Sequence, residues 1–455
     1  MFYSHKGGSR GSIDREDVLL PRFALRSLRR VLCTLVIVAN ADSMSRTVGT
    51  FVLEAASVLV LTSQASGRGK SVDSGIGETN DSPEKPAMYS GDGACLPCHK
   101  DRSSSYLMTS HHLASQEPEG GSILGSFKNA ENVLEIIKAG EGLFGDGLYF
   151  RMEAENGRFY QTAVRSKITE TGHLTNTAHR ERIDIVTGSG VRGQSYLYWH
   201  KSQLFELPVS YWSALHQWIN SPGYEDGTAN FNRPVYPRCL ECHATYIKTL
   251  SSDQSANGYE TSSLVVGILC EKCHGPGGTH VALETKHPLP QTEPQAILNP
   301  ALWSRDRNVD LCALCHNGVR RKALSPAFSY TAGDPLDTYL GPDLADSSMH
   351  PEVHGNQVAL LKRSRCYQAS PDMSCLTCHD VHAPEHPASE YSRHCLSCHQ
   401  IDNCSAAKHL GGTAAADCVS CHMPVQPTTA IISQTAGKLL RTSMRTHWIR
   451  VYPNQ

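Results

Sequence analysis

Aromatic residues are scarce in this 455-residue chain and make up 7% of it. The mean hydropathy is −0.34, which fits a globular protein without a transmembrane bundle. The formal net charge is −2, and no basic run of the kind that binds nucleic acid occurs, so nucleic acid is not expected as a partner. The sequence also lacks a phosphate-binding glycine loop, a dinucleotide fingerprint and a clear Ser/His/Asp arrangement. The glycine-rich residues 188–193 lie between predicted strands and are interpreted as a turn.

Cysteine, in contrast, is abundant and regularly placed. The chain has 17 cysteines, and 14 of them fall in seven copies of Cys-x-x-Cys-His. A chain of this composition would contain roughly 0.03 such matches by chance. Numbered 1 to 7 in chain order, the motifs are Cys95-Cys98-His99, Cys239-Cys242-His243, Cys270-Cys273-His274, Cys312-Cys315-His316, Cys375-Cys378-His379, Cys395-Cys398-His399 and Cys418-Cys421-His422.

This spacing indicates covalent attachment of haem c. Two thiols separated by two residues reach the two vinyl groups of one porphyrin, and the adjacent histidine supplies an imidazole ligand to the iron. A zinc site would need the cysteine pairs two at a time, yet their number is odd, and zinc would not require a histidine after every pair. We therefore expect seven covalently attached haems, whose porphyrins would supply the apolar mass that the few aromatic residues do not.

Several segments resemble multihaem cytochromes. Residues 94–111 and 267–280 are similar to two signatures of the cytochrome c-552/c-554 family, and residues 375–382 are similar to the doubled haem-motif modules of related cytochromes. Residues 417–424, with the late segment 447–450, resemble the ending of larger exported multihaem cytochromes. The resemblance implies stacked pairs of haems with two histidine ligands each, a mostly α-helical fold and electron transfer.

Further histidines are candidates for the second axial position of each iron. The leading candidates are His111, His280, His354, His382, His409 and His447, with His112, His350, His216 and His386 in reserve. His280 and His382 follow motifs 3 and 5 too closely to fold back over their own haems, so we expect each to serve a neighbouring haem. Arg450, close to His447, is expected to pair with a haem propionate.

The motif spacing leaves room for one short helix per haem, and the resemblance implies a mainly α fold, with extensive irregular loops around stacked haems. A β-meander insert is expected at about 120–215, where Asn156-Gly157 is a strong hairpin signal. The predicted divisions are a leader (1–65), a flexible linker (66–93), a first haem segment (94–119), a β-rich insert (120–233), haem domains at 234–330 and 331–426, and a C-terminal tail (427–455).

The N-terminus resembles an export signal. Arginines precede an apolar stretch, and cleavage is expected near Ala41, or near Ala65 if Met44 is the true start. An uncleaved leader that associates with a membrane is the alternative. A periplasmic or otherwise exported location is therefore expected, with other cytochromes or membrane quinol-linked complexes as redox partners.

Two functions remain open on the sequence. In an electron carrier every iron has two protein ligands, and the supply of histidines permits this. In an oxidoreductase one iron would stay open and act on nitrite, hydroxylamine or sulfite. The chain has no Cys-x-x-Cys-Lys motif and no evident proton donor, which favours the carrier. Cys366 and Cys404, outside the motifs, are either a disulfide or two single thiols.

Overall fold

The computed structural model describes residues 89–138, 140–142, 146–286, 296–318, 321–342, 356–411 and 417–452. The chain divides between Gly77 and Glu78, and all described residues belong to the second unit. The predicted leader, most of the predicted linker, and the candidates His354 and His350 lie outside the described residues. No helix in the described part is long and apolar enough to cross a membrane.

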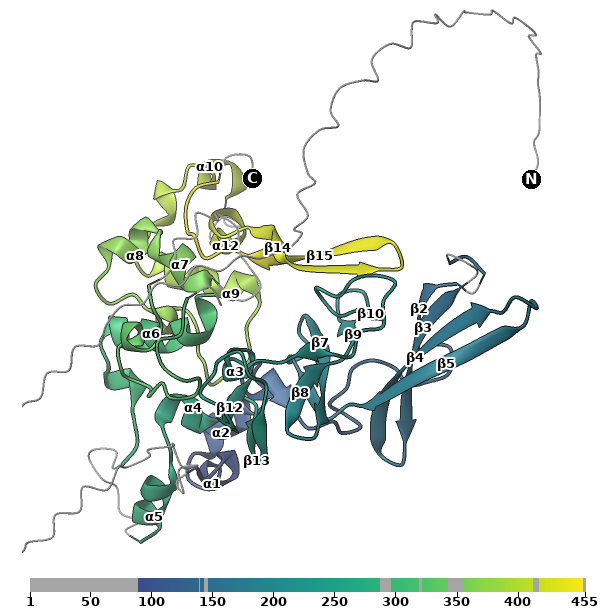
Figure 1. Ribbon diagram of the computed structural model, residues 1–455. Coiled ribbons are helices and arrows are strands. Elements are labelled where there is room, and N and C mark those ends of the chain that lie inside the picture. Colours follow the sequence, from purple (N-terminus) through teal and green to yellow (C-terminus); the bar gives the residue numbers. More distant parts are fainter. Residues whose placement is uncertain are drawn as a thin grey trace, which may run out of the picture. The chain divides into compact units, whose positions relative to one another are not determined.

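The first half of this unit is built from antiparallel β-sheet (Figure 1). A four-stranded sheet follows chain order, with strands β2 (Val133–Ile137), β3 (Gly147–Glu155), β4 (Arg158–Ile168) and β5 (Leu174–Arg182). Asn156 and Gly157 join β3 to β4 with φ of 51° and 74°, and Glu155 pairs with Arg158. This is the two-residue hairpin turn that the Asn-Gly pair predicts, so that prediction is confirmed.

A second, seven-stranded sheet follows. Its strands are β1 (Ser115–Gln116), β6 (Ile185–Thr187), β7 (Gly193–His200), β8 (Gln203–Glu206), β9 (Val209–Trp212), β10 (Gln217–Asn220) and β11 (Arg233–Pro234). The predicted turn at 188–193 joins β6 to β7, with φ of 93° at Gly188 and 88° at Gly190. One apolar core is shared by both sheets, because Phe150 and Tyr196, each fully buried, belong to the same cluster.

The described helices are short, and the longest has 12 residues. They are α1 (Asp92–Cys95), α2 (Lys100–Tyr106), α3 (Pro237–Glu241), α4 (Cys270–His274), α5 (Gly278–Lys286), α6 (Arg305–His316), α7 (Gln357–Lys362), α8 (Arg365–Ala369), α9 (Ala388–Leu396), α10 (Ala407–Leu410) and α12 (Cys418–His422). Isolated helices of this length are unstable in water, so packing must hold them in place. Most motifs begin within or at the end of one of these helices.

The prediction of a mainly α fold is wrong. The described chain is 26% helical and 29% strand, and it contains several antiparallel sheets. Strands also occur among the motifs, in the hairpin β12 (Ala244–Thr249) and β13 (Tyr259–Val266) and in the tail hairpin β14 (Val425–Thr435) and β15 (Lys438–Arg445). The intervals between motifs leave room only for short helices, and the remaining backbone satisfies its hydrogen bonds by pairing as hairpins.

The tail hairpin is attached to the β-rich half. Asn220 on β10 donates its backbone N–H to the Thr435 hydroxyl (3.0 Å) and its side-chain amide to the Gln434 carbonyl (2.7 Å). The Ser433 hydroxyl donates back to the Asn220 carbonyl (2.8 Å). These buried bonds fix where the chain turns back toward His447.

Candidate haem-binding cavity

A single cavity of about 4520 Å³ is lined by residues of all seven motifs, including every motif cysteine and histidine. We call it the motif cavity. A single ligand pocket measures roughly 300–1,000 Å³, so this space suits several large groups. All 14 motif cysteines are free thiols, as covalent attachment to vinyl groups requires. Cys366 and Cys404 are also separate thiols that line the cavity.

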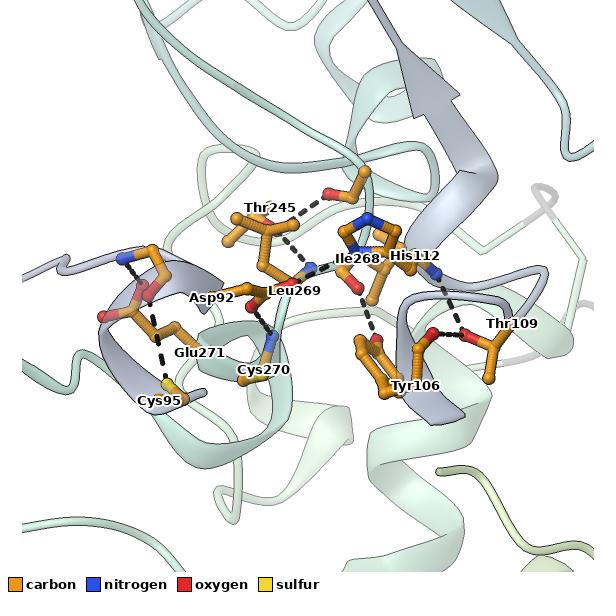
Figure 2. A network of polar contacts seen from close by, with 12 residues as sticks. Asp92, Cys95, Tyr106, Thr109, His112, Thr245, Ile268, Leu269, Cys270 and Glu271 are labelled. Carbon is orange, nitrogen blue, oxygen red and sulfur yellow. Dashed lines mark hydrogen bonds and ion pairs between the residues drawn. The ribbon is translucent and has the colours of Figure 1, made fainter. Parts of the chain in front are cut away.

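Motifs 1 and 3 are held together by two carboxylates that act reciprocally (Figure 2). Asp92, before motif 1, accepts the backbone N–H of Cys270 in motif 3 (2.9 Å). Glu271, within motif 3, accepts the N–H groups of Ser90 and Gly91 (2.7 and 2.9 Å). The side chains of Cys95 and Cys270 consequently lie close enough to affect each other's pKa.

Asp92 also pairs with His112, whose Nδ1 lies 3.1 Å from the carboxylate. Burial raises the pKa of Asp92, but its hydrogen bonds with His112 and Cys270 outweigh burial and leave the pKa below its usual value. Tyr106 adds a further link, because its hydroxyl donates to the Ile268 carbonyl just before motif 3. Sequence reasoning missed Asp92 and Glu271 as organising residues, since nothing local marks their distant partners.

Arg238 joins motif 2 to motif 4 and also forms a buried ion pair within motif 2. Arg238 lies 2.6 Å from the Glu241 carboxylate and also donates to the Leu314 carbonyl inside motif 4. Glu241 is fully buried and also accepts the Tyr339 hydroxyl (2.6 Å). The Cys242 and Cys315 side chains affect each other's pKa across this junction.

The remaining motifs continue this series of contacts. The Cys312 side chain of motif 4 and Cys375 of motif 5 affect each other's pKa, and Cys312 also interacts electrostatically with Cys273 of motif 3. Cys395 of motif 6 interacts electrostatically with Cys378 of motif 5 and with Cys418 of motif 7. The motifs thus meet in the order 1, 3, 4, 5, 6, 7, with motif 2 beside motif 4.

Four motif histidines face a second histidine across the cavity. The ring centroids are 6.4 Å apart for His99 and His280, 6.1 Å for His274 and His382, 5.9 Å for His316 and His111, and 6.0 Å for His379 and His447. Imidazoles on opposite faces of one iron, each bound at about 2 Å, have centroids about 6 Å apart. These four pairs therefore fit haem iron between them.

Three motif histidines have a backbone carbonyl as hydrogen-bond acceptor at Nδ1. Nδ1 of His274 lies 2.8 Å from the Leu298 carbonyl, and Nδ1 of His422 lies 3.0 Å from the Arg450 carbonyl. Nδ1 of His243 lies 3.2 Å from the Ala114 carbonyl. An acceptor at Nδ1 fixes the proton there and leaves Nε2 for the metal.

Burial keeps two paired imidazoles neutral, which is the form that binds a metal. Desolvation lowers the pKa of His316 to about 4 and that of His447 to about 4. Burial also lowers the pKa of His111 and of His382. The pKa of His379 is instead raised, chiefly by its hydrogen bond with Glu385.

The other described candidate histidines lie outside these four pairs, and of them His386 lines the motif cavity. His409 is exposed on α10 and is not among the residues that line the cavity. Among the reserves, His216 is exposed in a turn, and His386 pairs with Glu390 (3.3 Å). His394, which sequence reasoning did not single out, does line the cavity; its position directly before Cys395 was the available signal.

Two arginines offer unused donors to anionic groups. Within the described residues, the buried Nε atoms of Arg450 and Arg238 have no hydrogen-bond acceptor. The guanidinium of Arg450 also lies over the Trp448 and Tyr452 rings, at 3.9 and 4.5 Å from their centroids. Because both arginines line the motif cavity, they suit the propionates of haem.

Comparison with known families agrees with this donor set. Residues 214–275 match the family model for cytochrome c554 and c-prime, and this region contains motifs 2 and 3. Over these residues the chain is similar to c-type cytochromes. The family implies covalently bound haem c, with its iron, and electron transfer.

No curated protein matches this chain. The solved structure of the outer cell wall cytochrome OcwA is similar to this chain, with a TM-score of 0.48 and 16% sequence identity. The match covers 80% of this chain and 79% of the OcwA chain.

Proposed function

We propose that this cytochrome is an exported electron carrier with seven haems, most of them held between two histidines. The observation that carries the proposal is the set of four histidine pairs, each with ring centroids close to 6 Å apart. Haem supplies reversible one-electron chemistry at its iron, and a second protein ligand leaves that iron no position for substrate. The chain's own residues orient the imidazoles and hold the attachment sites against one another.

The contacts between motifs support a defined order of electron transfer. Interactions between cysteine side chains join motifs 1 and 3, 2 and 4, 3 and 4, and 4 and 5, and they extend the series to motifs 6 and 7. The proposed order is 1–3–4–5–6–7, with motif 2 as a branch at motif 4. Either end would exchange electrons with another redox protein, such as a second cytochrome or a quinol-linked membrane complex.

The test is the haem content and spin state of the mature ferric protein. A pyridine haemochrome assay against protein mass should give seven haems per chain. The absorption spectrum should be predominantly low-spin and should not change on addition of cyanide. Five or fewer haems in a fully matured sample would contradict the proposal, as would a largely high-spin spectrum.

An oxidoreductase acting on a small nitrogen or sulfur compound is the second candidate, and one observation favours it. Glu206 lines the motif cavity, and Arg233 lies 3.3 Å from its carboxylate. Both residues interact electrostatically with Cys239 of motif 2. Burial raises the pKa of Glu206 to about 6, which suits a proton donor, and Arg233 suits an anion such as nitrite or sulfite.

This second candidate predicts a ligand-induced spectral change with nitrite, hydroxylamine or sulfite. The Glu206→Gln variant should then keep its haems and lose turnover. A ferric spectrum that none of these compounds alters would exclude this reading and leave the carrier.

A further inference from the structure

His379 of motif 5 differs from three other motif histidines in the chemistry of its hydrogen-bond partner. Its Nδ1 lies 3.2 Å from a carboxylate oxygen of Glu385. The Nδ1 atoms of His243, His274 and His422 face neutral backbone carbonyls instead. Hydrogen bonds to an ionised acceptor are roughly twice as strong as neutral ones, so the partner of His379 polarises its imidazole more.

Glu385 is held in this position by the helix that follows it. The Tyr391 hydroxyl, on α9, donates to the Glu385 carboxylate, and the same hydroxyl accepts the backbone N–H of His386 (3.3 Å). The ring of Tyr391 also lies 5.3 Å from that of His379. The carboxylate is thus fixed by a residue that itself packs on the histidine, which makes the contact a built feature of this site.

The opposite face of the same site carries a neutral arrangement. His447 stacks opposite His379 at 26°, and its Nδ1 lies 2.8 Å from the Gln357 side-chain oxygen. One ligand of the pair therefore has a charged partner and the other an uncharged amide. Of these two partners only Glu385 carries a charge, so it is the one that changes how strongly the histidine pair donates electrons to the iron.

We propose that Glu385 is a positioning residue that acts through His379 and lowers the reduction potential of the fifth haem, an inference that rests on the proposed haem attachment. A carboxylate at Nδ1–H gives the imidazole partial imidazolate character and strengthens its donation to the metal. Stronger donation and a nearby negative charge both favour the ferric over the ferrous state. The fifth haem is then the hardest to reduce among those whose Nδ1 partners are described.

The position of motif 5 gives this effect a consequence for electron flow. Motif 5 contacts motif 4 through Cys312 and motif 6 through Cys395. It is the junction between motifs 1 to 4 and motifs 6 and 7. A low reduction potential at the fifth haem makes electron transfer into it thermodynamically unfavourable, and Glu385 determines by how much.

The test compares Glu385→Gln with the wild-type holoprotein by potentiometric titration followed by optical and electron paramagnetic resonance spectroscopy. Glutamine keeps an oxygen acceptor and removes the charge. The potential of one haem should rise by about 59 mV, which corresponds to a tenfold change in a one-electron equilibrium constant. The fourth haem should shift by less, because the paired His111 and His316 also interact electrostatically with Glu385, and the remaining haems should keep their potentials.

Glu390→Gln is the matched control, because Glu390 lies on α9 and pairs with His386 rather than with a motif histidine. It should leave all potentials unchanged. Seven low-spin haems with unaltered potentials in Glu385→Gln would overturn the inference while leaving the proposed function intact. An equal shift in both variants would also overturn it, since the effect would then be one of general charge. A wild-type protein with too few haems, or without a low-spin fifth haem, would instead refute the proposed function.

Discussion

The imidazole rings of His379 and His447 lie stacked, with centroids 6.0 Å apart and planes inclined by 26°, although 68 residues of sequence separate them. His447 is reached only because the tail runs out along β14, returns along β15 and is then held by Gln357 and Ser364. His379 belongs to a local sequence motif, whereas His447 is brought opposite it only by the tertiary structure.

Replacing His447 by alanine should remove one axial ligand and convert one low-spin haem to high-spin. Electron paramagnetic resonance of the ferric protein should show a new high-spin signal, and cyanide should now bind one haem. His173→Ala is the control, since His173 is exposed in a turn of the β-rich half. A spectrum identical to that of the wild type would refute the assignment of His447.

The angles between paired rings predict different signals from different haems. The planes of His111 and His316 are inclined by 76°, whereas those of His99 and His280, and of His274 and His382, are inclined by 24° and 31°. Near-perpendicular imidazoles make the iron orbitals almost degenerate, so the fourth haem should give a highly anisotropic low-spin signal. Near-parallel pairs should give ordinary rhombic signals.

His111→Ala should remove that highly anisotropic signal selectively. If the rhombic signals disappear instead, the pairing of His111 with His316 is wrong.

Loss of one attachment thiol should affect one haem. Cys242→Ser leaves a single thioether at motif 2, so haem content should fall by up to one per chain if the fold is retained. Mass spectrometry of the intact protein and of its haem peptides would locate the loss. Cys404→Ser is the control, because Cys404 lies outside every motif and its loss should leave seven haems. Loss of several haems with normal circular dichroism would contradict independent attachment.

Asp92 should make the contact between motifs 1 and 3 sensitive to acid. Its folded-state pKa lies below the ordinary value of 3.8, so its stabilising effect is complete above about pH 4 and is lost as the pH falls through the folded-state pKa. Asp92→Ala would leave the half-buried Cys270 N–H without this acceptor and should cost about 1–3 kcal/mol. Thermal unfolding at pH 7 should show a lower midpoint for Asp92→Ala than for the exposed control Asp101→Ala. The difference should shrink on acidification below pH 4, and a constant difference would count against the carboxylate's role.

Arg450 should bind an anionic group of a haem. Arg450→Gln keeps part of the stacking surface against Trp448 and removes the charge, so one propionate should lose a charge-assisted hydrogen bond of about 1.5–3 kcal/mol. The pH dependence of one haem potential should shift, as measured by titrations at several pH values. Arg441→Gln, exposed on β15, should have no such effect. Identical titrations for both variants would remove Arg450 from the site.

Parts of the fold could be predicted because local signals determine them. Asn156-Gly157 requires two positive φ angles in succession, and the resulting turn fixes the register of β3 against β4. The tail hairpin escaped prediction because its turn, Ala436-Gly437, is a weaker signal and because β14 gains buried hydrogen bonds from the distant β10. The mainly α expectation failed for the same reason, since strand pairing depends on partners that a local pattern does not identify.

The sequence by itself determined where haem attaches, because two thiols and an imidazole must reach one porphyrin and only a fixed short spacing allows this. It also provided a supply of further histidines, without indicating which iron each would face. Only the tertiary structure decided that His111 meets His316, and that Glu385 rather than a backbone carbonyl faces His379. The second ligand of an iron must approach from the opposite face of the ring, and the residues that reach that face come from segments distant in the chain. Their identity therefore depends on how the sheets and short helices pack.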